Sequence, residues 1–372
     1  MNAMMKTVII SFALSSVVMS GCAVLVGNED TEAQTSQAPL KIISIETLRN
    51  QQSLRGEGFK DVAFNTNSAD TLQLPVSVFA DAFKVYVVDK APTSRIFIFN
   101  RGERTVTILD RTKIKAANSG VLVDPSGVPV PDSGENPVAF DGSSIVPIVP
   151  SGIAVDMSGD IFVADSQQGR VFGYDSNGRL LMTFGRTGGI LHPSGLAIDN
   201  RRGRLYIADE HAHQVKVFST TGDPMGNSLF TVSGSNKASE GFKFPSSVAL
   251  DRAGNLYVLD STRRRVYVYD PDAKFIRVFA VHHDTWGGAL RPKGIAVDSM
   301  GHVYITDMVS NSVFIFNPDG ALLLNWGRTG VVGGDFMMPA GIFIDSQDSI
   351  YIADQTNGRV QHFNFSMNRP EK

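Results

Sequence analysis

A unit that recurs six times constrains the fold of this chain more than any other feature of its sequence. Each unit opens with a proline that is followed six residues later by an aspartate, and a second aspartate then closes a strand-like segment. The prolines are Pro75, Pro150, Pro193, Pro245, Pro292 and Pro339, and the second aspartates are Asp89, Asp165, Asp209, Asp260, Asp307 and Asp354. A third apolar segment ends in an aromatic residue, and in most units a glycine turn leads to a fourth, as at Gly320 before Leu322–Trp326. One unit therefore predicts a four-stranded antiparallel meander.

Six such sheets are apolar on both faces, so each needs a neighbour on either side. This requirement predicts an all-β, six-bladed β-propeller over residues 40–365. In the first strand of most units, small residues stand two and four positions after the proline, as Gly152 and Ala154 do. Larger aliphatic residues alternate with them, which is typical of inner strands that crowd around a central axis.

The sixth unit ends after its third strand at Phe363, and residues 366–372 form a polar tail rather than a fourth strand. An unpaired edge strand is a liability that proteins usually cover. Residues 40–45, LKIISI, form an otherwise isolated strand-like segment directly before the first unit. We therefore expect this N-terminal strand to complete the last blade and to close the ring.

The repeated motif resembles the NHL repeat. Clear instances are PSGIAVD at Pro150–Asp156 and PKGIAVD at Pro292–Asp298, with Gly-x-[Ile/Leu/Val]-[Tyr/Phe]-[Ile/Val]-x-Asp and Arg-Val-x-x-[Phe/Tyr] further on. The resemblance implies a six-bladed propeller. It does not imply one function, because relatives of this kind include scaffolds for proteins or peptides, extracellular sensor domains and a few enzymes.

The N-terminus carries the features of an export signal. Residues 7–19 are apolar but too short to span a bilayer comfortably, and Met19-Ser20-Gly21-Cys22 resembles a bacterial lipobox. We expect a lipoprotein signal peptide at residues 1–21, lipidation of Cys22 and a flexible tether at 22–39. Ala23 is not the aspartate that resembles an inner-membrane retention signal, so a Gram-negative host would place the protein on the outer membrane, facing the periplasm. As the only cysteine, Cys22 also excludes an intramolecular disulfide and any cysteine-cluster metal site.

Topology divides the expected disc into two faces. The turns between strands 2 and 3 and the connections between blades lie on one face, here named the upper face; the other turns lie on the lower face. The proline-containing insertion at 111–149, between blades 1 and 2, is expected to form a lid or an irregular flap over the upper face.

Basic residues gather in the upper-face connections. We expect them to form a basic rim that holds an anionic group of a ligand through charge-assisted hydrogen bonds. The basic rim consists of Arg186, Arg263, Arg264, Arg291, Lys293 and Arg328. Acidic neighbours such as Glu210, Glu240 and Asp284 leave open the alternative that these are solvated surface charges.

A metal site is the alternative for the same face. A zinc-dependent amidating lyase of this fold needs three histidines from separate blades, and His192, His211 (or His213) and His282 (or His283) come from three different loops. A calcium-dependent lactonase would need carboxylates at the channel mouth. The positions directly after the six prolines offer none: Val76, Ser151, Ser194, Ser246, Lys293 and Ala340. The second aspartates recur in every unit, so we expect them to cap turns rather than to hold a cation.

The charge balance excludes one class of partner. With 34 Lys+Arg against 37 Asp+Glu, the net charge of −3 gives no overall attraction to nucleic acid. We expect an exported, lipid-anchored scaffold that binds a protein or peptide partner at the cell envelope, without a cofactor and without catalysis. The alternative is a metal-dependent lyase or lactonase-like enzyme that uses the channel mouth, with zinc or calcium.

Overall fold

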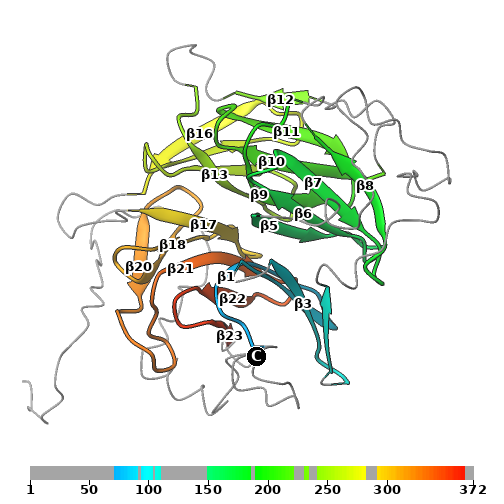
Figure 1. The fold of residues 1–372 in the computed structure, drawn as a ribbon. Coiled ribbons are helices and arrows are strands. Elements are labelled where there is room, and N and C mark those ends of the chain that lie inside the picture. Colours follow the sequence, from blue (N-terminus) through cyan, green and yellow to red (C-terminus); the bar gives the residue numbers. More distant parts are fainter. Residues whose placement is uncertain are drawn as a thin grey trace, which may run out of the picture.

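The computed structural model describes residues 71–90, 94–103, 105–109, 149–185, 189–221, 230–233, 241–281 and 291–364. In these ranges the chain forms six antiparallel sheets arranged around a central axis, and it contains no helix (Figure 1). This confirms the all-β, six-bladed β-propeller. In the part of the chain that the structure describes, we find no helix that is long and apolar enough to cross a membrane.

The blades follow one another along the chain, and each is a meander. Blade 1 contains β1 (Pro75–Ala80), β2 (Lys84–Asp89), β3 (Arg95–Asn100) and β4 (Thr105–Leu109); blade 2 contains β5 (Pro150–Val155), β6 (Ile161–Asp165), β7 (Arg170–Tyr174) and β8 (Leu180–Phe184); blade 3 contains β9 (Pro193–Asp199), β10 (Arg204–Asp209), β11 (Gln214–Ser219) and β12 (Phe230–Val232). Blade 4 contains β13 (Pro245–Leu250), β14 (Leu256–Asp260), β15 (Arg265–Tyr269) and β16 (Phe275–Ala280); blade 5 contains β17 (Pro292–Val297), β18 (Val303–Asp307), β19 (Ser312–Phe316) and β20 (Leu322–Trp326); blade 6 contains β21 (Pro339–Ile344), β22 (Ser349–Asp354) and β23 (Arg359–Asn364).

The first strand of every blade lies innermost, where it contacts the first strands of both neighbouring blades. Glycines allow this close approach. A Cβ added to Gly152 would lie 2.3 Å from the carbonyl oxygen of Ser194 in the next blade, and one added to Gly294 would lie 2.6 Å from that of Ala340. The small residues in the first strands are therefore required by the narrow radius of the inner ring, as the sequence pattern predicts.

The ring closes where blade 6 packs on blade 1. The rings of Phe79 and Phe343 lie 4.4 Å apart between the two inner strands, and Tyr351 and Val360 of blade 6 share one apolar cluster with Val85 of blade 1. Among the described residues, the sheet of blade 6 has three strands. The segment expected to supply its fourth strand, residues 40–45, lies outside the described residues, so this part of the fold stays a prediction. The signal peptide, the tether, most of the 111–149 insertion and the tail also lie outside them.

The second aspartates are fully buried and accept backbone hydrogen bonds. Asp209 accepts the amides of Leu191 and His192 at 2.7 and 3.0 Å, so it fixes the incoming blade connection to the end of β10. In each of the other blades, the second aspartate likewise accepts at least one amide of the incoming connection. Asp354 also forms an ion pair with Arg359, five residues further along the chain, at 2.8 Å. The turn-capping role predicted for these aspartates is confirmed.

The first aspartates cap the lower-face turns between strands 1 and 2. Asp298 Oδ1 accepts the amides of Met300 and His302, and its Oδ2 accepts the Tyr304 hydroxyl at 3.1 Å. Burial, together with the charge of Asp298, raises the pKa of Tyr304 well above its usual range. The tyrosine therefore stays protonated and acts as a hydrogen-bond donor in this network.

Candidate functional site

The upper mouth of the channel is built from the N-terminal ends of the inner strands. Three of its side chains are serines whose hydroxyls donate to backbone carbonyls. Ser151 donates to Pro193 O at 2.8 Å, and Ser194 is within 3.4 Å of Pro245 O, each carbonyl belonging to the next blade. Ser151 and Ser194 therefore join neighbouring blades, whereas the Ser246 hydroxyl donates to Leu259 O of its own blade at 3.4 Å. Lys293 stands at the equivalent position in β17 and breaks the pattern.

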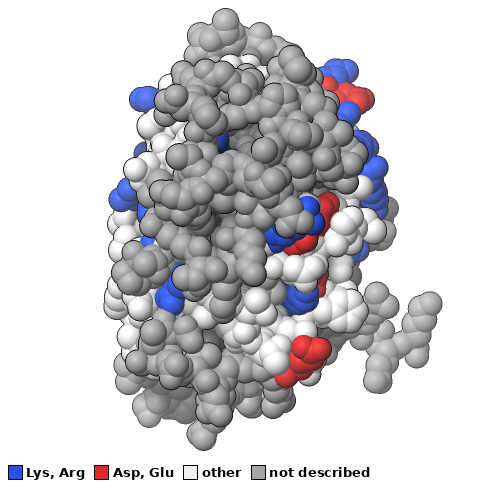
Figure 2. Space-filling view, turned by 45° about the vertical axis from the view of Figure 1, so that its right-hand side comes forward, with Lys and Arg blue, Asp and Glu red and all other residues white. Residues whose placement is uncertain are grey.

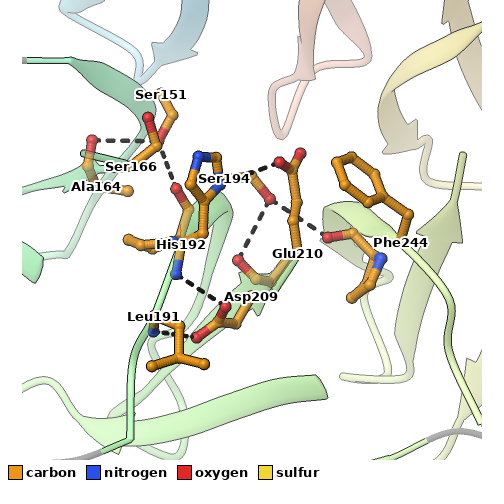
Figure 3. A network of polar contacts seen from close by, with 12 residues as sticks. Ser151, Ala164, Ser166, Leu191, His192, Ser194, Asp209, Glu210 and Phe244 are labelled. Atoms are coloured by element: carbon orange, nitrogen blue, oxygen red, sulfur yellow. Dashed lines mark hydrogen bonds and ion pairs between the residues drawn. The ribbon is translucent and has the colours of Figure 1, made fainter. Parts of the chain in front are cut away.

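Glu210 is the acidic group at this mouth. It directly follows β10, is only 4% exposed, and its carboxylate Oε2 lies 3.1 Å from His192 Nδ1. Figure 3 shows the His192 ring and the Glu210 carboxylate facing each other beside the serines that join the blades. The other oxygen, Oε1, is buried and has no hydrogen bond to any described residue. A buried carboxylate oxygen in this state is costly unless something else donates to it.

Lys293 reaches Glu210 from two blades away. Its Nζ lies 3.7 Å from Glu210 Oε1, and its side chain is 42% exposed. This distance allows ionic attraction but exceeds a normal hydrogen bond. The fourth member of the group is His211, whose ring stacks on that of His192 with centroids 4.2 Å apart. We name His192, Glu210, Lys293 and His211 the mouth cluster.

A second feature of the upper face is the connection between blades 5 and 6, residues 328–338, here named the braced loop. Arg359 of β23 donates to the carbonyls of Val331, Val332 and Asp335 at 2.6 to 3.0 Å. Gln361 and Asn357 add bonds to Asp335 O and Gly330 O. The loop is thus fixed by side chains of blade 6, although the outward-facing side chains of Val331 and Val332 remain 67% and 55% exposed.

The residues of the basic rim occupy different parts of this face. Lys293 lies at the channel mouth with Arg291 directly before β17, whereas Arg263 and Arg264 lie in the β14–β15 turn. Arg328 follows the outermost strand of blade 5, and its Nε bonds Asp335 Oδ1 at 3.1 Å within the braced loop. Arg186 lies outside the described residues. Figure 2 shows basic side chains dispersed over the visible surface, with some beside acidic ones.

The structure describes two of the three histidines of the alternative metal site. His192 and His211 are stacked, and His282 lies outside the described residues. Within the described ranges, no group of three or more His, Cys, Asp or Glu side chains is arranged to hold a metal ion.

Sequence reasoning assigned Glu210 no role beyond that of an acidic neighbour. A signal was present, because the residue after the second aspartate differs among the units: Lys90, Ser166, Glu210, Ser261, Met308 and Gln355. Only one of these is acidic, and only one of the six residues after the prolines, Lys293, is basic. Glu210 and Lys293 thus depart from the repeated pattern with opposite charges, which indicates a site. The sequence does not show that the two side chains lie close together.

Two protein families match parts of the chain. The family described as "SMP-30/Gluconolactonase/LRE-like region" matches residues 200–327, and one described as "6-bladed beta-propeller" matches residues 294–370. Each covers less than half of the chain. The first match contains both Glu210 and Lys293.

Curated relatives include a protein that is named for the same kind of repeat. "NHL repeat-containing protein 2" of Bos taurus is 28% identical over 164 residues, covering 36% of this chain and 22% of that protein. "Protein brain tumor" of Drosophila melanogaster is 26% identical over 135 residues, which are 35% of this chain and 12% of that protein. The chain therefore matches less than a quarter of the length of either relative. The resemblance to NHL repeats is confirmed.

Solved structures share the architecture. A structural genomics protein of unknown function from Bacteroides thetaiotaomicron superposes with a TM-score of 0.53 and 15% identity, over 80% of this chain and 70% of that one. A catalytically inactive virginiamycin B lyase from Staphylococcus aureus with quinupristin gives 0.50 and 11%, over 82% and 88%. At these identities the likeness establishes the fold alone.

Proposed function

We propose that this protein is an exported, lipid-anchored propeller that binds a protein or peptide partner at the cell envelope through its upper face. The observation that carries the proposal is the braced loop, which holds two exposed valines in a fixed position. The NHL-type repeat supports the proposal, since rigid propellers present binding residues on their loops.

Preorganisation of the braced loop lowers the cost of binding a partner. An exposed apolar side chain contributes to binding only after the cost of ordering its loop is met. Here Arg359, Gln361 and Asn357 order the backbone around Val331 and Val332 in the free protein. Two further apolar side chains on this face, Val309 and Met338, are 53% and 40% exposed, and Met338 is held by an amide bond to Asn311 Oδ1. Together they favour a partner with an apolar contact surface.

Charge adds a second requirement on the partner. Arg264 and Arg291 are exposed at the upper face. Acidic groups on the partner would complement them, which raises the association rate more than the affinity. Arg328 has a different role in this proposal, because its bond to Asp335 stabilises the braced loop from within.

Photo-crosslinking tests the contact surface. With a crosslinking amino acid at Val332, we expect a discrete covalent adduct in intact cells, and none from Met157. Met157 is a matched control because it is 85% exposed but lies in the lower-face β5–β6 turn. Serine at both Val331 and Val332 is expected to reduce adducts formed from position 264 by about tenfold, the effect of losing one or two central apolar contacts. Adducts from position 157 with none from 332 would place the partner on the other face.

Lipid anchoring is tested separately at Cys22. The substitution Cys22→Ser is expected to abolish incorporation of labelled fatty acid and to release the protein from the membrane fraction, because no acyl chain would remain to hold it. Met19→Leu, which restores the usual lipobox residue, is the control and is expected to leave labelling intact. Membrane retention of the Cys22→Ser protein would refute the anchor.

The enzyme alternative has one specific observation in its favour, the His192–Glu210 pair in the region that matches the gluconolactonase-like family. A metal-dependent lyase or lactonase-like activity would use the channel mouth, with zinc or calcium. Stoichiometric zinc or calcium in the purified protein would favour this alternative over the binding scaffold.

A further inference from the structure

The connection that leads into blade 6 departs from the repeat by one residue, Met338. We propose that Met338 is the side chain by which the upper face selects its partner: it enters an apolar pocket of a partner protein, beside a carboxylate that pairs with Arg291. This inference rests on the partner-binding function proposed above and adds to it the chemistry that the partner must present.

Hydrogen bonds show that Met338 is an extra residue. In blades 1 to 5, the residue directly before the proline donates its amide to the second aspartate, and its carbonyl accepts the amide of the residue after that aspartate. In blade 6 both roles belong to Met337, whose amide donates to Asp354 at 2.7 Å and whose carbonyl accepts from Thr356 at 3.0 Å. Met338 therefore stands between the residue that is fixed to β22 and Pro339.

The backbone of Met338 adopts a conformation that does not favour methionine. Its φ is +56°, in the left-handed region, whereas the residues before the five other prolines, all described by the structure, have no positive φ. Glycine and asparagine adopt this region more readily than other residues. Strain of this kind concentrates at functional sites. The backbone alone would favour glycine at this position, so the methionine side chain points to a role in contact.

An asparagine of blade 5 holds the extra residue in place. Asn311, in the β18–β19 turn, accepts the Met338 amide through Oδ1 at 2.7 Å, and its Nδ2 donates to Thr329 Oγ1 at 2.8 Å. One side-chain amide thus connects both ends of the braced loop. Met338 is nevertheless 40% exposed, so its backbone is fixed in the free protein while part of its side chain remains available to a partner.

Neighbouring side chains define the chemistry of the partner. Val309, which is 53% exposed, lies in the same turn as Asn311. Arg291 is exposed, and its carbonyl accepts the amide of Met308 in this turn. The surface beside Met338 therefore combines apolar side chains with a cation. An unbranched thioether side chain adapts to the shape of an apolar pocket, and a carboxylate at the rim of that pocket would complement Arg291.

Two substitutions separate the contact from the fold. Met338→Gly and Met338→Asn both suit a positive φ, so each is expected to keep the melting temperature or to raise it by up to about 2 °C. With the crosslinking amino acid at position 264, outside the braced loop, both are expected to lower the yield of the partner adduct about tenfold, the effect of losing a central contact. Met338→Leu keeps an apolar side chain and is expected to retain most of the adduct.

The charge of Arg291 is tested in isolated cell envelopes at low and high salt. Arg291→Gln removes the charge and keeps a long polar side chain. We expect the adduct yield of this variant to depend less on salt than that of the unaltered protein, because salt screens the pairing of Arg291 with a carboxylate. An unchanged salt dependence would contradict the carboxylate on the partner.

Met300→Gly is the matched control, because Met300 is 39% exposed but lies in the lower-face β17–β18 turn. It is expected to leave the adduct yield unchanged. Undiminished adducts in both Met338→Gly and Met338→Asn would overturn the inference and leave the proposed function intact. A lowered melting temperature in both variants would assign Met338 to the packing of the fold and would also overturn it. If the unaltered protein formed no adduct, the proposed function would be refuted, and this inference with it.

Discussion

Replacing Gly152 with alanine is expected to lower the free energy of unfolding by about 3 kcal/mol or more, at the upper end of the range for overpacked sites. The added Cβ would lie 2.3 Å from Ser194 O and 3.3 Å from Leu196 N. Both atoms belong to the backbone of β9, which is fixed on its other side by blade 4. No side-chain rotation relieves such a clash, so two inner strands must separate. Denaturant unfolding followed by circular dichroism measures the loss.

The matched control is Gly102→Ala in the turn between β3 and β4. There the nearest heavy atom to the added Cβ, Asn100 Oδ1, is 3.7 Å away, which is ordinary contact. We expect a change within about 0.5 kcal/mol, as at other exposed turns. Equal changes in the free energy of unfolding for the two substitutions would show that the inner strands are packed less closely than in the structure.

Deletion of residues 40–46 is expected to destabilise the protein even more. In our interpretation this segment is the fourth strand of blade 6, and its Leu40, Ile42, Ile43 and Ile45 offer apolar side chains. Burial of each such side chain contributes about 1.5–3 kcal/mol, so the loss of two or three amounts to about 5 kcal/mol. The edge of β23 would also be left unpaired, which favours aggregation. Thermal unfolding and light scattering report the two effects.

Deletion of residues 30–36 from the expected tether is the control, since it removes the same length of chain without removing a strand. It is expected to leave the melting temperature unchanged. If the protein without residues 40–46 had the same melting temperature as this control, residues 40–46 would not be the fourth strand of blade 6.

Much of the fold follows from the sequence because its determining interactions are local and repeated. The second aspartates bond amides that precede them by 15 to 18 residues, just before the proline that opens the same unit. The nearly constant spacing between each aspartate and the amides that it bonds is therefore visible in the sequence. The small residues after each proline likewise indicate that the first strands crowd around the central axis. Because the unit recurs six times with the same spacing, the sequence also predicts the number of blades.

The sequence predicts only part of the candidate site. Topology alone places Lys293 in the basic rim, and in the structure its Nζ also lies 3.7 Å from Glu210 Oε1. Arg328 was assigned to the same rim, and it forms an internal bond to Asp335. The Arg328 contact depends on how the braced loop folds, and the Lys293 contact depends on how far apart blades 3 and 5 lie in the closed ring; neither has a periodic signal in the sequence.

The sequence by itself thus determined the repeated unit, its four-strand pattern and the capping role of its aspartates. Only the tertiary structure decided which exceptional residues meet: Glu210 of blade 3 and Lys293 of blade 5 on the upper face, and Arg252 of blade 4, which donates to Ser346 O of blade 6, on the lower face. Each of these contacts passes over an intervening blade. Their formation depends on the radius of the closed ring and the reach of one long side chain, and neither quantity is encoded in the spacing of a single repeat.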